Sequence, residues 1–201
     1  MHERRACRFL AARTVVVAAL VWHLAAGGAV AAEKSLRLDP AKAKVEFFLG
    51  TPLHDVEGSF ALRSGEVRFD PATGAASGEV VVDLTGARTG NGSRDKTMHE
   101  EVLESKRFPL ATWRFEKVEG TLPASGAGTV KLVGTLDFHG APHPLALPAT
   151  VEVDGSRLRG KTEMSIPFLD WGLHDPSLFF LRVERVVRVT IALEGELVET
   201  P

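Results

Sequence analysis

Apolar and polar residues alternate with a period of two through most of the chain after residue 55. This alternation is typical of a β-strand that buries one face and exposes the other. Turn residues separate several of the alternating runs, for example at 70–74 and 154–156. Seven runs stand out, at residues 56–69, 80–84, 111–115, 130–138, 145–153, 158–166 and 187–193. The pattern predicts seven or eight long strands, joined mostly by short turns.

One segment departs from this alternation. Met98, Val102 and Leu103 are spaced to lie on one face of a helix. Thr97 and Glu100 have the spacing of a capping box, in which each side chain bonds a backbone amide at the helix start. We therefore expect a short helix near residues 95–105 that caps or flanks the sheet.

The length and spacing of the strands fit either a closed barrel or a sandwich. Their length favours the barrel, because closure removes the exposed edges of the sheet, and eight strands can enclose one small ligand. The expected fold is all-β: an antiparallel eight-stranded β-barrel with a short flanking helix. No linker, repeat or low-complexity tract interrupts the chain after residue 33, so residues 33–201 are predicted to form one domain.

The first 32 residues have the order of a secretory signal peptide. Four arginines precede an uncharged apolar run at 14–26, and small residues follow at 27–32. The apolar run has thirteen residues, fewer than the roughly 20 that span a bilayer as a helix. We expect cleavage near Ala32 and a periplasmic or secreted protein without a transmembrane anchor. Arg4-Arg5 leaves open whether export follows the general or the twin-arginine route.

Cleavage would change the composition that matters for function. It removes four of the 24 basic and one of the 26 acidic residues, which leaves a net charge of −5. It also removes Cys7, the only cysteine, and with it any disulfide, thiol nucleophile or cysteine-bound metal. The mild acidity and dispersed charges argue against a nucleic acid partner.

The inward positions of the strands are nearly all apolar, with small residues among them. Gly58, Gly134, Ala149 and Gly160 are the small ones. They have two interpretations: they leave space for an apolar ligand, or they relieve the curvature of a barrel that larger neighbours fill. The period of the pattern does not distinguish a hollow barrel from a filled one.

The chain contains no recognisable catalytic constellation. It has neither a nucleophile elbow nor a phosphate-binding loop. His139 and His143 flank a turn, so their four-residue spacing does not indicate a helical metal site. We predict no catalytic residue, no metal and no cofactor. The densest polar cluster, at 89–95, is either a structural network around Arg94 and Asp95 or a contact between Arg94 and a ligand head group.

Several motifs occur in a characteristic order. They are Leu53–Phe60, Gly65–Asp70, Thr89-Gly90-Asn91 followed by Arg94-Asp95, Leu103-Glu104-Ser105 before Phe108-Pro109, Val133–Gly140, Asp170-Trp171-Gly172 and a closing Val-rich strand. In these motifs the chain resembles the YceI-like family of exported polyisoprenoid-binding proteins, from about Leu36 to Val198. Met98-His99 and Phe168 depart from the commoner members of the family, which points to a divergent subgroup.

The resemblance implies a lipocalin-like barrel that holds a long isoprenoid chain, such as a quinone or a prenyl phosphate, without catalysis. The expected site combines inward strand residues with an opening guarded by the helix and a long loop. The predicted apolar residues are Phe47, Phe60, Phe69, Val82, Met98, Leu103, Trp113, Phe115, Leu132, Leu136, Met164, Phe168, Trp171, Phe180 and Ile191, with Arg94 as the candidate head-group contact. The alternatives are a filled barrel that acts through its surface, as a stress-related or adhesion partner, and an enzyme acting on a hydrophobic substrate. A homodimer is left open.

Overall fold

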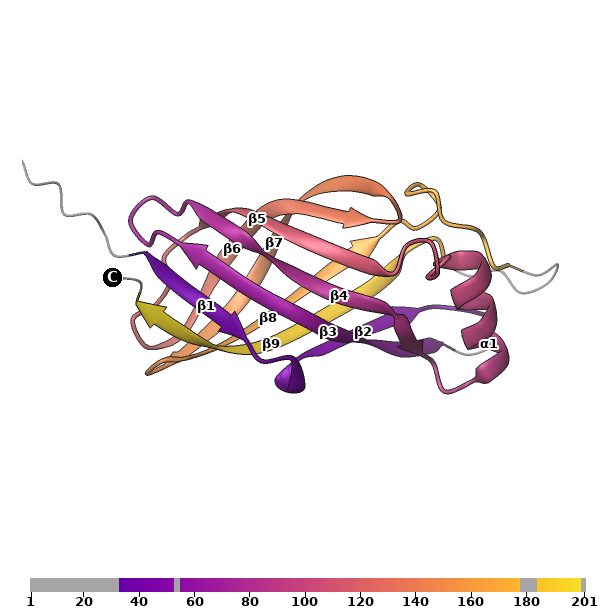
Figure 1. Ribbon diagram of the computed structural model, residues 1–201, viewed down its shortest axis with the longest axis horizontal. Coiled ribbons are helices and arrows are strands. Elements are labelled where there is room, and N and C mark those ends of the chain that lie inside the picture. Colours follow the sequence, from indigo (N-terminus) through magenta and orange to yellow (C-terminus); the bar gives the residue numbers. More distant parts are fainter. Residues whose placement is uncertain (1–32, 53–54, 178–183, 200–201) are drawn as a thin grey trace, which may run out of the picture. The chain divides into compact units, whose positions relative to one another are not determined.

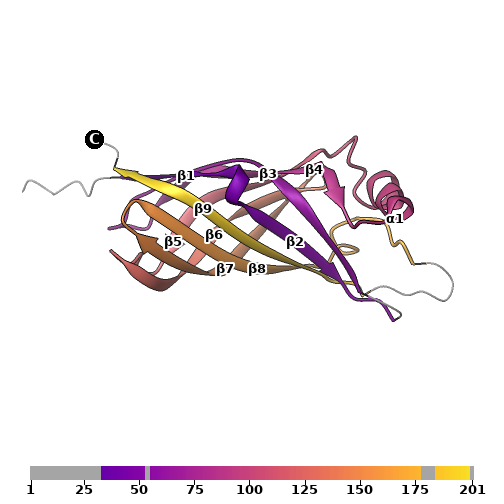
Figure 2. The ribbon, with the colours of Figure 1, turned by 90° about the horizontal axis from the view of Figure 1, so that it is seen from below.

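The computed structural model describes residues 33–52, 55–177 and 184–199, and in these residues one antiparallel sheet closes on itself (Figures 1 and 2). The predicted signal peptide and its cleavage site lie outside the described residues. The strands are β1 (Lys34–Leu38), β2 (Lys44–Leu49), β3 (Val56–Phe69), β4 (Ala76–Arg88), β5 (Leu110–Glu119), β6 (Gly126–Phe138), β7 (Ala141–Asp154), β8 (Arg157–Ile166) and β9 (Val187–Glu199).

The pairing order of the strands shows how the barrel closes. It runs β1-β3-β2-β9-β8-β7-β6-β5-β4, and β4 pairs back onto β3. β1 and β2 both lie between β3 and β9: β1 pairs with residues 66–69 of β3, and β2 pairs with residues 56–60. They therefore share one position in the wall. The prediction of an antiparallel eight-stranded barrel is confirmed.

A short 3-10 helix, η1 (Pro40–Lys42), separates β1 from β2. Asp39 caps this turn by accepting a hydrogen bond from the Ala41 amide, and Pro40 provides its first residue. Both strands are short, so the alternation over 34–49 is weaker than in the long hairpins. That is why the pattern of alternation did not identify β1 and β2 as separate strands.

The inward face of β3 changes phase partway along the strand. Leu62 and Gly65 are both buried although they are three residues apart. The register with β4 shifts between Ser59 and Ala61 and again between Leu62 and Ser64. A β-bulge adds one residue to a strand, so the face that points inward switches from even-numbered to odd-numbered positions. A similar shift occurs in β5 between Phe115 and Lys117.

The predicted helix is present, but it starts earlier than expected. An α-helix, α1 (Gly92–Thr97), continues as a π-helix, η2 (Met98–Val102), at one end of the barrel (Figure 1). The Asn91 side chain caps α1, since its Oδ1 accepts hydrogen bonds from the amides of Ser93 and Arg94, both at 3.1 Å. Thr97 makes no side-chain capping bond, so the predicted capping box is wrong. Asn91 is the cap because its side-chain oxygen precedes the helix and accepts from these two amides, which have no partner within the helix.

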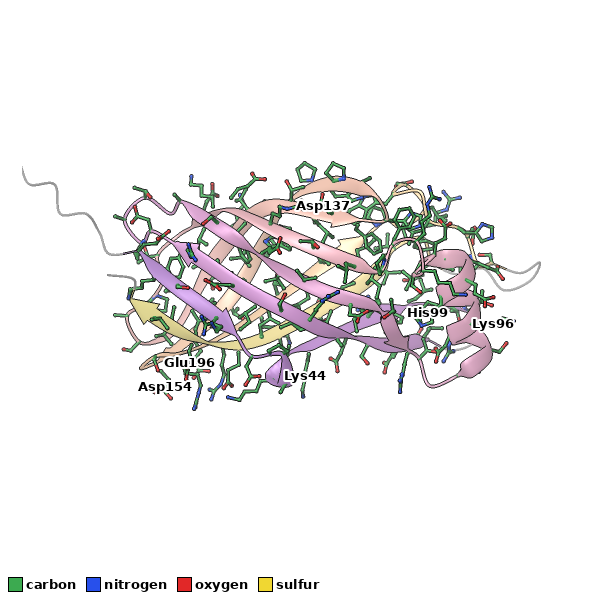
Figure 3. The ribbon with its side chains drawn as sticks, viewed as in Figure 1. Lys44, Lys96, His99, Asp137, Asp154 and Glu196 are labelled. Atoms are coloured by element: carbon green, nitrogen blue, oxygen red, sulfur yellow. The ribbon has the colours of Figure 1, made fainter. Side chains whose placement is uncertain are left out.

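Side chains of the barrel wall divide into two sets, as the alternation predicts. Charged residues such as Lys44, Asp154 and Glu196 lie on the outer face (Figure 3). The inner face carries an apolar core that includes Val45, Leu84 and Val189. Within the described part of the chain, none of the helices has the length and hydrophobicity needed to cross a membrane.

Candidate functional site

The barrel interior contains an apolar cavity of about 570 Å³. This volume lies within the range of roughly 300–1,000 Å³ that is common for pockets holding small ligands. Most of the predicted apolar residues lie on its wall, namely Phe47, Phe60, Val82, Met98, Leu103, Trp113, Phe115, Leu132, Leu136, Met164, Phe168 and Ile191. The barrel is therefore hollow toward the end that carries α1.

Two of the predicted residues lie elsewhere, and a third is not among the described residues. Phe69 borders a second, smaller cavity of the barrel. Trp171 lies outside the main cavity, where its ring stacks on that of His143 at a centroid distance of 3.8 Å. The loop after β8 turns back on itself, with the Leu173 amide bonded to the Phe168 carbonyl. Phe168 and Leu173 border the cavity, and Trp171 does not. Phe180 lies outside the described residues.

The prediction missed several residues of the cavity wall, although the same period-two alternation marks them. Val45 and Leu49 have the same phase as Phe47 on β2, and Val187 and Val189 have the same phase as Ile191 on β9. Extending the period-two pattern in both directions from each predicted residue would have found them. Pro176, in the loop before β9, also borders the cavity, and no periodic signal marks it.

The rim of the cavity at the α1 end is polar. It consists of Thr51, Thr89, Asn91, Ser93, Arg94 and Thr97. Asn91 and Ser93 are exposed, so the cavity reaches the surface beside α1. Among the described residues that border this cavity, Arg94 alone carries an ionisable side chain. As far as the structure describes the chain, the arrangement is an apolar chamber with one positive charge, that of Arg94, at its mouth.

Arg94 is held in place by a hydrogen-bond network. Its Nε donates to Thr89 Oγ1 at 2.8 Å, and its Nη2 donates to the Thr89 carbonyl at 3.1 Å. The Thr89 hydroxyl and amide in turn donate to Asp95 Oδ1 at 2.5 and 2.8 Å. These bonds to the carboxylate, first of all the one from the Thr89 side chain, lower the pKa of Asp95.

The polar cluster is a structural network, as the first interpretation predicts, and Arg94 also borders the cavity. Two of its three guanidinium nitrogens serve the structural network with Thr89. The third, Nη1, makes no hydrogen bond to another described residue, and the side chain borders the cavity. A guanidinium fixed in this way offers N–H donors to a phosphate or carbonyl oxygen of a ligand head group.

The contacts of His99, a residue labelled in Figure 3, are structural. Its Nε2 lies 2.9 Å from the Ala87 carbonyl oxygen, and its Nδ1 lies 2.9 Å from Ser105 Oγ. A carbonyl can only accept, so Nε2 carries the proton and Nδ1 accepts from the Ser105 hydroxyl. Ser105 is 5% exposed. The histidine thus ties the segment after η2 to β4, away from the cavity wall.

No histidine of the described segments borders the main cavity. The described residues also contain no group of three or more His, Cys, Asp or Glu side chains suited to hold a metal ion. His139 instead contacts Glu104, with its Nε2 3.2 Å from Glu104 Oε2. Both residues have a positive φ, of 51° and 44°, and the contact joins the β6–β7 turn to the segment after η2.

The inward glycines have different roles. A Cβ on Gly58 would lie 2.3 Å from the Phe47 ring, and one on Gly134 would lie 2.1 Å from the Arg114 carbonyl oxygen. These two glycines permit close packing and do not create space. A Cβ on Gly160 would have its nearest neighbour, Leu158 Cδ2, at 3.9 Å, and Gly160 borders the second cavity, of about 100 Å³.

The closed antiparallel barrel with its apolar chamber defines a β-barrel of the lipocalin-like type. The chain belongs to the YceI-like family, since the model of the YceI-like domain matches residues 36–195. The resemblance noted in the sequence is thus confirmed. A comparison with curated protein sequences finds no match.

Solved structures share this fold. BcnA of Burkholderia cenocepacia is 22% identical with a TM-score of 0.64, and the match covers 78% of this chain and 98% of BcnA. A polyisoprenoid binding domain from Saccharophagus degradans, implicated in plant cell wall breakdown, is 20% identical with a TM-score of 0.65, covering 80% and 97%. The Campylobacter jejuni YceI protein is 20% identical with a TM-score of 0.55, covering 72% and 86%. At these identities the similarity shows a shared fold.

Proposed function

We propose that this protein is an exported, non-catalytic carrier that holds a polyisoprenoid amphiphile, either an isoprenoid quinone or a prenyl phosphate, in its barrel. One observation carries the proposal: in the described residues the main cavity is apolar along its wall and has one cation, Arg94, at its mouth. An apolar chamber selects an apolar chain, and a cation at the opening selects a head group with negative or partly negative oxygens.

The energetics favour a long tail. Each isoprene unit that leaves water buries on the order of 100 Å² of apolar surface, which is worth about 2.5 kcal/mol at about 25 cal/mol per Å². Association costs about 4–15 kcal/mol in lost translational and rotational freedom, before any ordering of the tail. Three or four units would contribute about 8–10 kcal/mol, so shorter isoprenoids would bind weakly.

The comparisons support this choice of ligand. The domain from Saccharophagus degradans, which has the same fold, is described as polyisoprenoid binding. The head group would lie beside Arg94, with the tail running inward past residues such as Val82 and Met164.

The structure also bears on the two alternatives from the sequence. An enzyme that uses a hydroxyl of the cavity border as nucleophile would need a general base beside it, and the described wall residues include no His, Cys, Asp or Glu. A barrel acting only through its surface would need no chamber of this volume. Neither alternative accounts for an apolar cavity with a cation at its mouth.

The export part of the proposal rests on the signal-like first 32 residues. Expression of the full chain in a bacterial host should yield a periplasmic protein that begins at Ala32 or Glu33. Intact-mass measurement on the purified protein tests this. A mass that retains residues 1–31 would contradict export by cleavage.

The binding part is tested by the lipid that copurifies with the protein. Organic extraction and mass spectrometry should find a polyisoprenoid bound to the wild type. Met164→Trp, which fills the main cavity from β8, should abolish the bound lipid. Ser165→Trp is the matched control, because the next residue of the same strand is exposed on the outer face. Extraction of no lipid from the wild type, or equal lipid from both variants, would overturn the proposal.

A further inference from the structure

The barrel holds two cavities in series, and a layer of side chains separates them. The main cavity opens beside α1, and the smaller one, of about 100 Å³, lies toward the other end, next to β1 and the loop that carries Leu122. The residues that border both are Val80, Phe115, Leu132, Thr162, Ile191 and Leu193. We refer to Phe115, Leu132, Ile191 and Leu193 as the partition.

The smaller cavity, which we call the distal cavity, owes its space to small side chains on neighbouring strands. Ala149 and Gly160 border it from β7 and β8. A Cβ on Gly160 would meet no atom closer than 3.9 Å. Val130, Ala149 and Val151 form a packed cluster with Leu122 at this end. The distal cavity is therefore an apolar pocket with this cluster on one side.

The partition consists of apolar side chains that face empty space. Its four residues point inward yet are only partly buried, which is the result expected when each faces a cavity on at least one side. Phe115 lies opposite Gly134 in the β5–β6 ladder, so no side chain packs against it from that position.

We propose that the distal cavity is a subsite for the terminal isoprene unit of the ligand, and that the partition sets the length of chain that the barrel accepts. This inference rests on the proposed function, because it concerns the tail of the proposed ligand. The distal cavity, of about 100 Å³, is smaller than the cavity of about 150 Å³ that holds benzene, so it would take the end of one branched five-carbon unit. The chain end enters when Phe115 turns aside.

The test measures affinity for a series of prenyl phosphates that differ by one isoprene unit, with delipidated protein from the full-length gene. Gly160→Leu fills the distal cavity, so it should weaken binding of the longest accepted ligand about 10- to 100-fold and leave the ligand one unit shorter unchanged. Glu163→Leu is the matched control, because its side chain is exposed on the outer face of the same strand and Glu163 borders neither cavity. It should leave the whole length profile unchanged.

Phe115→Ala removes the main obstacle in the partition. It should bind the longer members of the series at least about 10-fold more tightly than the wild type, and the double variant with Gly160→Leu should lose this gain. Phe60→Ala enlarges the main cavity but leaves the partition intact. Any gain in affinity that it gives should therefore persist when Gly160→Leu is added. If Phe115→Ala fails to fold, Leu193→Ala provides the same opening from β9.

The outcomes separate this inference from the proposed function. If the wild type binds neither a member of this series nor an isoprenoid quinone, the carrier proposal itself fails. If the wild type binds but folded Gly160→Leu has an unchanged length profile, the distal subsite is wrong and the carrier proposal stands. A gain in Phe115→Ala that survives in the double variant also overturns the subsite.

Discussion

Arg94 offers the sharpest test of how the site recognises a head group. Replacing it with glutamine removes the charge but keeps an amide that can still donate to the Thr89 carbonyl. In the structure two guanidinium nitrogens bond Thr89, and Nη1 has no hydrogen-bond partner among the described residues. The interaction that the substitution removes is thus the charge-assisted hydrogen bond that Nη1 offers to the ligand.

The expected loss follows from this geometry. A hydrogen bond to a charged group contributes about 1.5–3 kcal/mol. Arg94 is only half-buried, so water screens the interaction and the lower part of that range, about 1.5–2 kcal/mol, applies. We expect Arg94→Gln to raise the Kd for a prenyl phosphate about 10- to 30-fold. The Kd for the prenyl alcohol with the same tail should change less than about threefold, because the tail contacts are unaffected.

The assay uses a tryptophan that the structure places on the cavity wall. Trp113 borders the main cavity, while Trp171 lies outside it, so Trp171→Phe leaves Trp113 as the reporter of binding in the described part of the chain. Titrations with the phosphate and the alcohol then give both Kd values. Arg94→Lys, which keeps the charge, should recover part of the affinity for the phosphate. Equal weakening of phosphate and alcohol would show that Arg94 acts by supporting α1, and no weakening would remove it from the site.

Three further predictions concern stability. Gly134→Ala should lower the free energy of unfolding by about 2–3 kcal/mol, because its Cβ would lie 2.1 Å from the Arg114 carbonyl, and Gly160→Ala by less than about 1 kcal/mol; similar urea midpoints for the two would contradict this. Asp95→Asn should lower the Tm near neutral pH. Hydrogen bonds from Thr89 lower the pKa of the folded Asp95 below its ordinary 3.8, so its stabilisation is present above that value and is lost as the pH falls through the folded pKa; a Tm difference that persists at about pH 2 would refute the assignment. His99→Ala should cost about 1–3 kcal/mol in urea unfolding, because the buried Ser105 hydroxyl loses its partner, while lipid retention by the folded variant stays unchanged; loss of lipid at full stability would contradict the structural role.

Much of the fold could be predicted from the sequence because the barrel is built from long hairpins. A strand with one solvent-exposed and one buried face must alternate polar and apolar residues. The strands β6 to β9 therefore appear directly in the pattern, together with inward residues such as Leu136 and Met164. The long ladders, such as the thirteen paired positions between β6 and β7, keep one register throughout. Alternation therefore identified both the strands and most of the cavity wall.

Turns and irregular loops were harder to predict, because local geometry decides them. Trp171 was expected at the opening, yet the turn between Phe168 and Leu173 directs it onto His143. An aromatic residue in a loop has no period to indicate which side it faces. Local geometry also decides where α1 starts. The Asn91 side chain caps the helix there, in place of the predicted capping box.

The glycines show most clearly why a hollow barrel cannot be recognised from its sequence. Gly58, Gly134 and Gly160 occupy equivalent inward positions in the alternation, so the pattern assigns them one role. In the structure a neighbouring group takes the space at the first two: the Phe47 ring at Gly58, and the Arg114 carbonyl, next to the β5 bulge, at Gly134. Only at Gly160 does the missing side chain leave a void. Whether an absent side chain creates space therefore depends on bulges and on side-chain packing across the barrel. Both are properties of strand pairing, and neither is encoded in the period of a single strand.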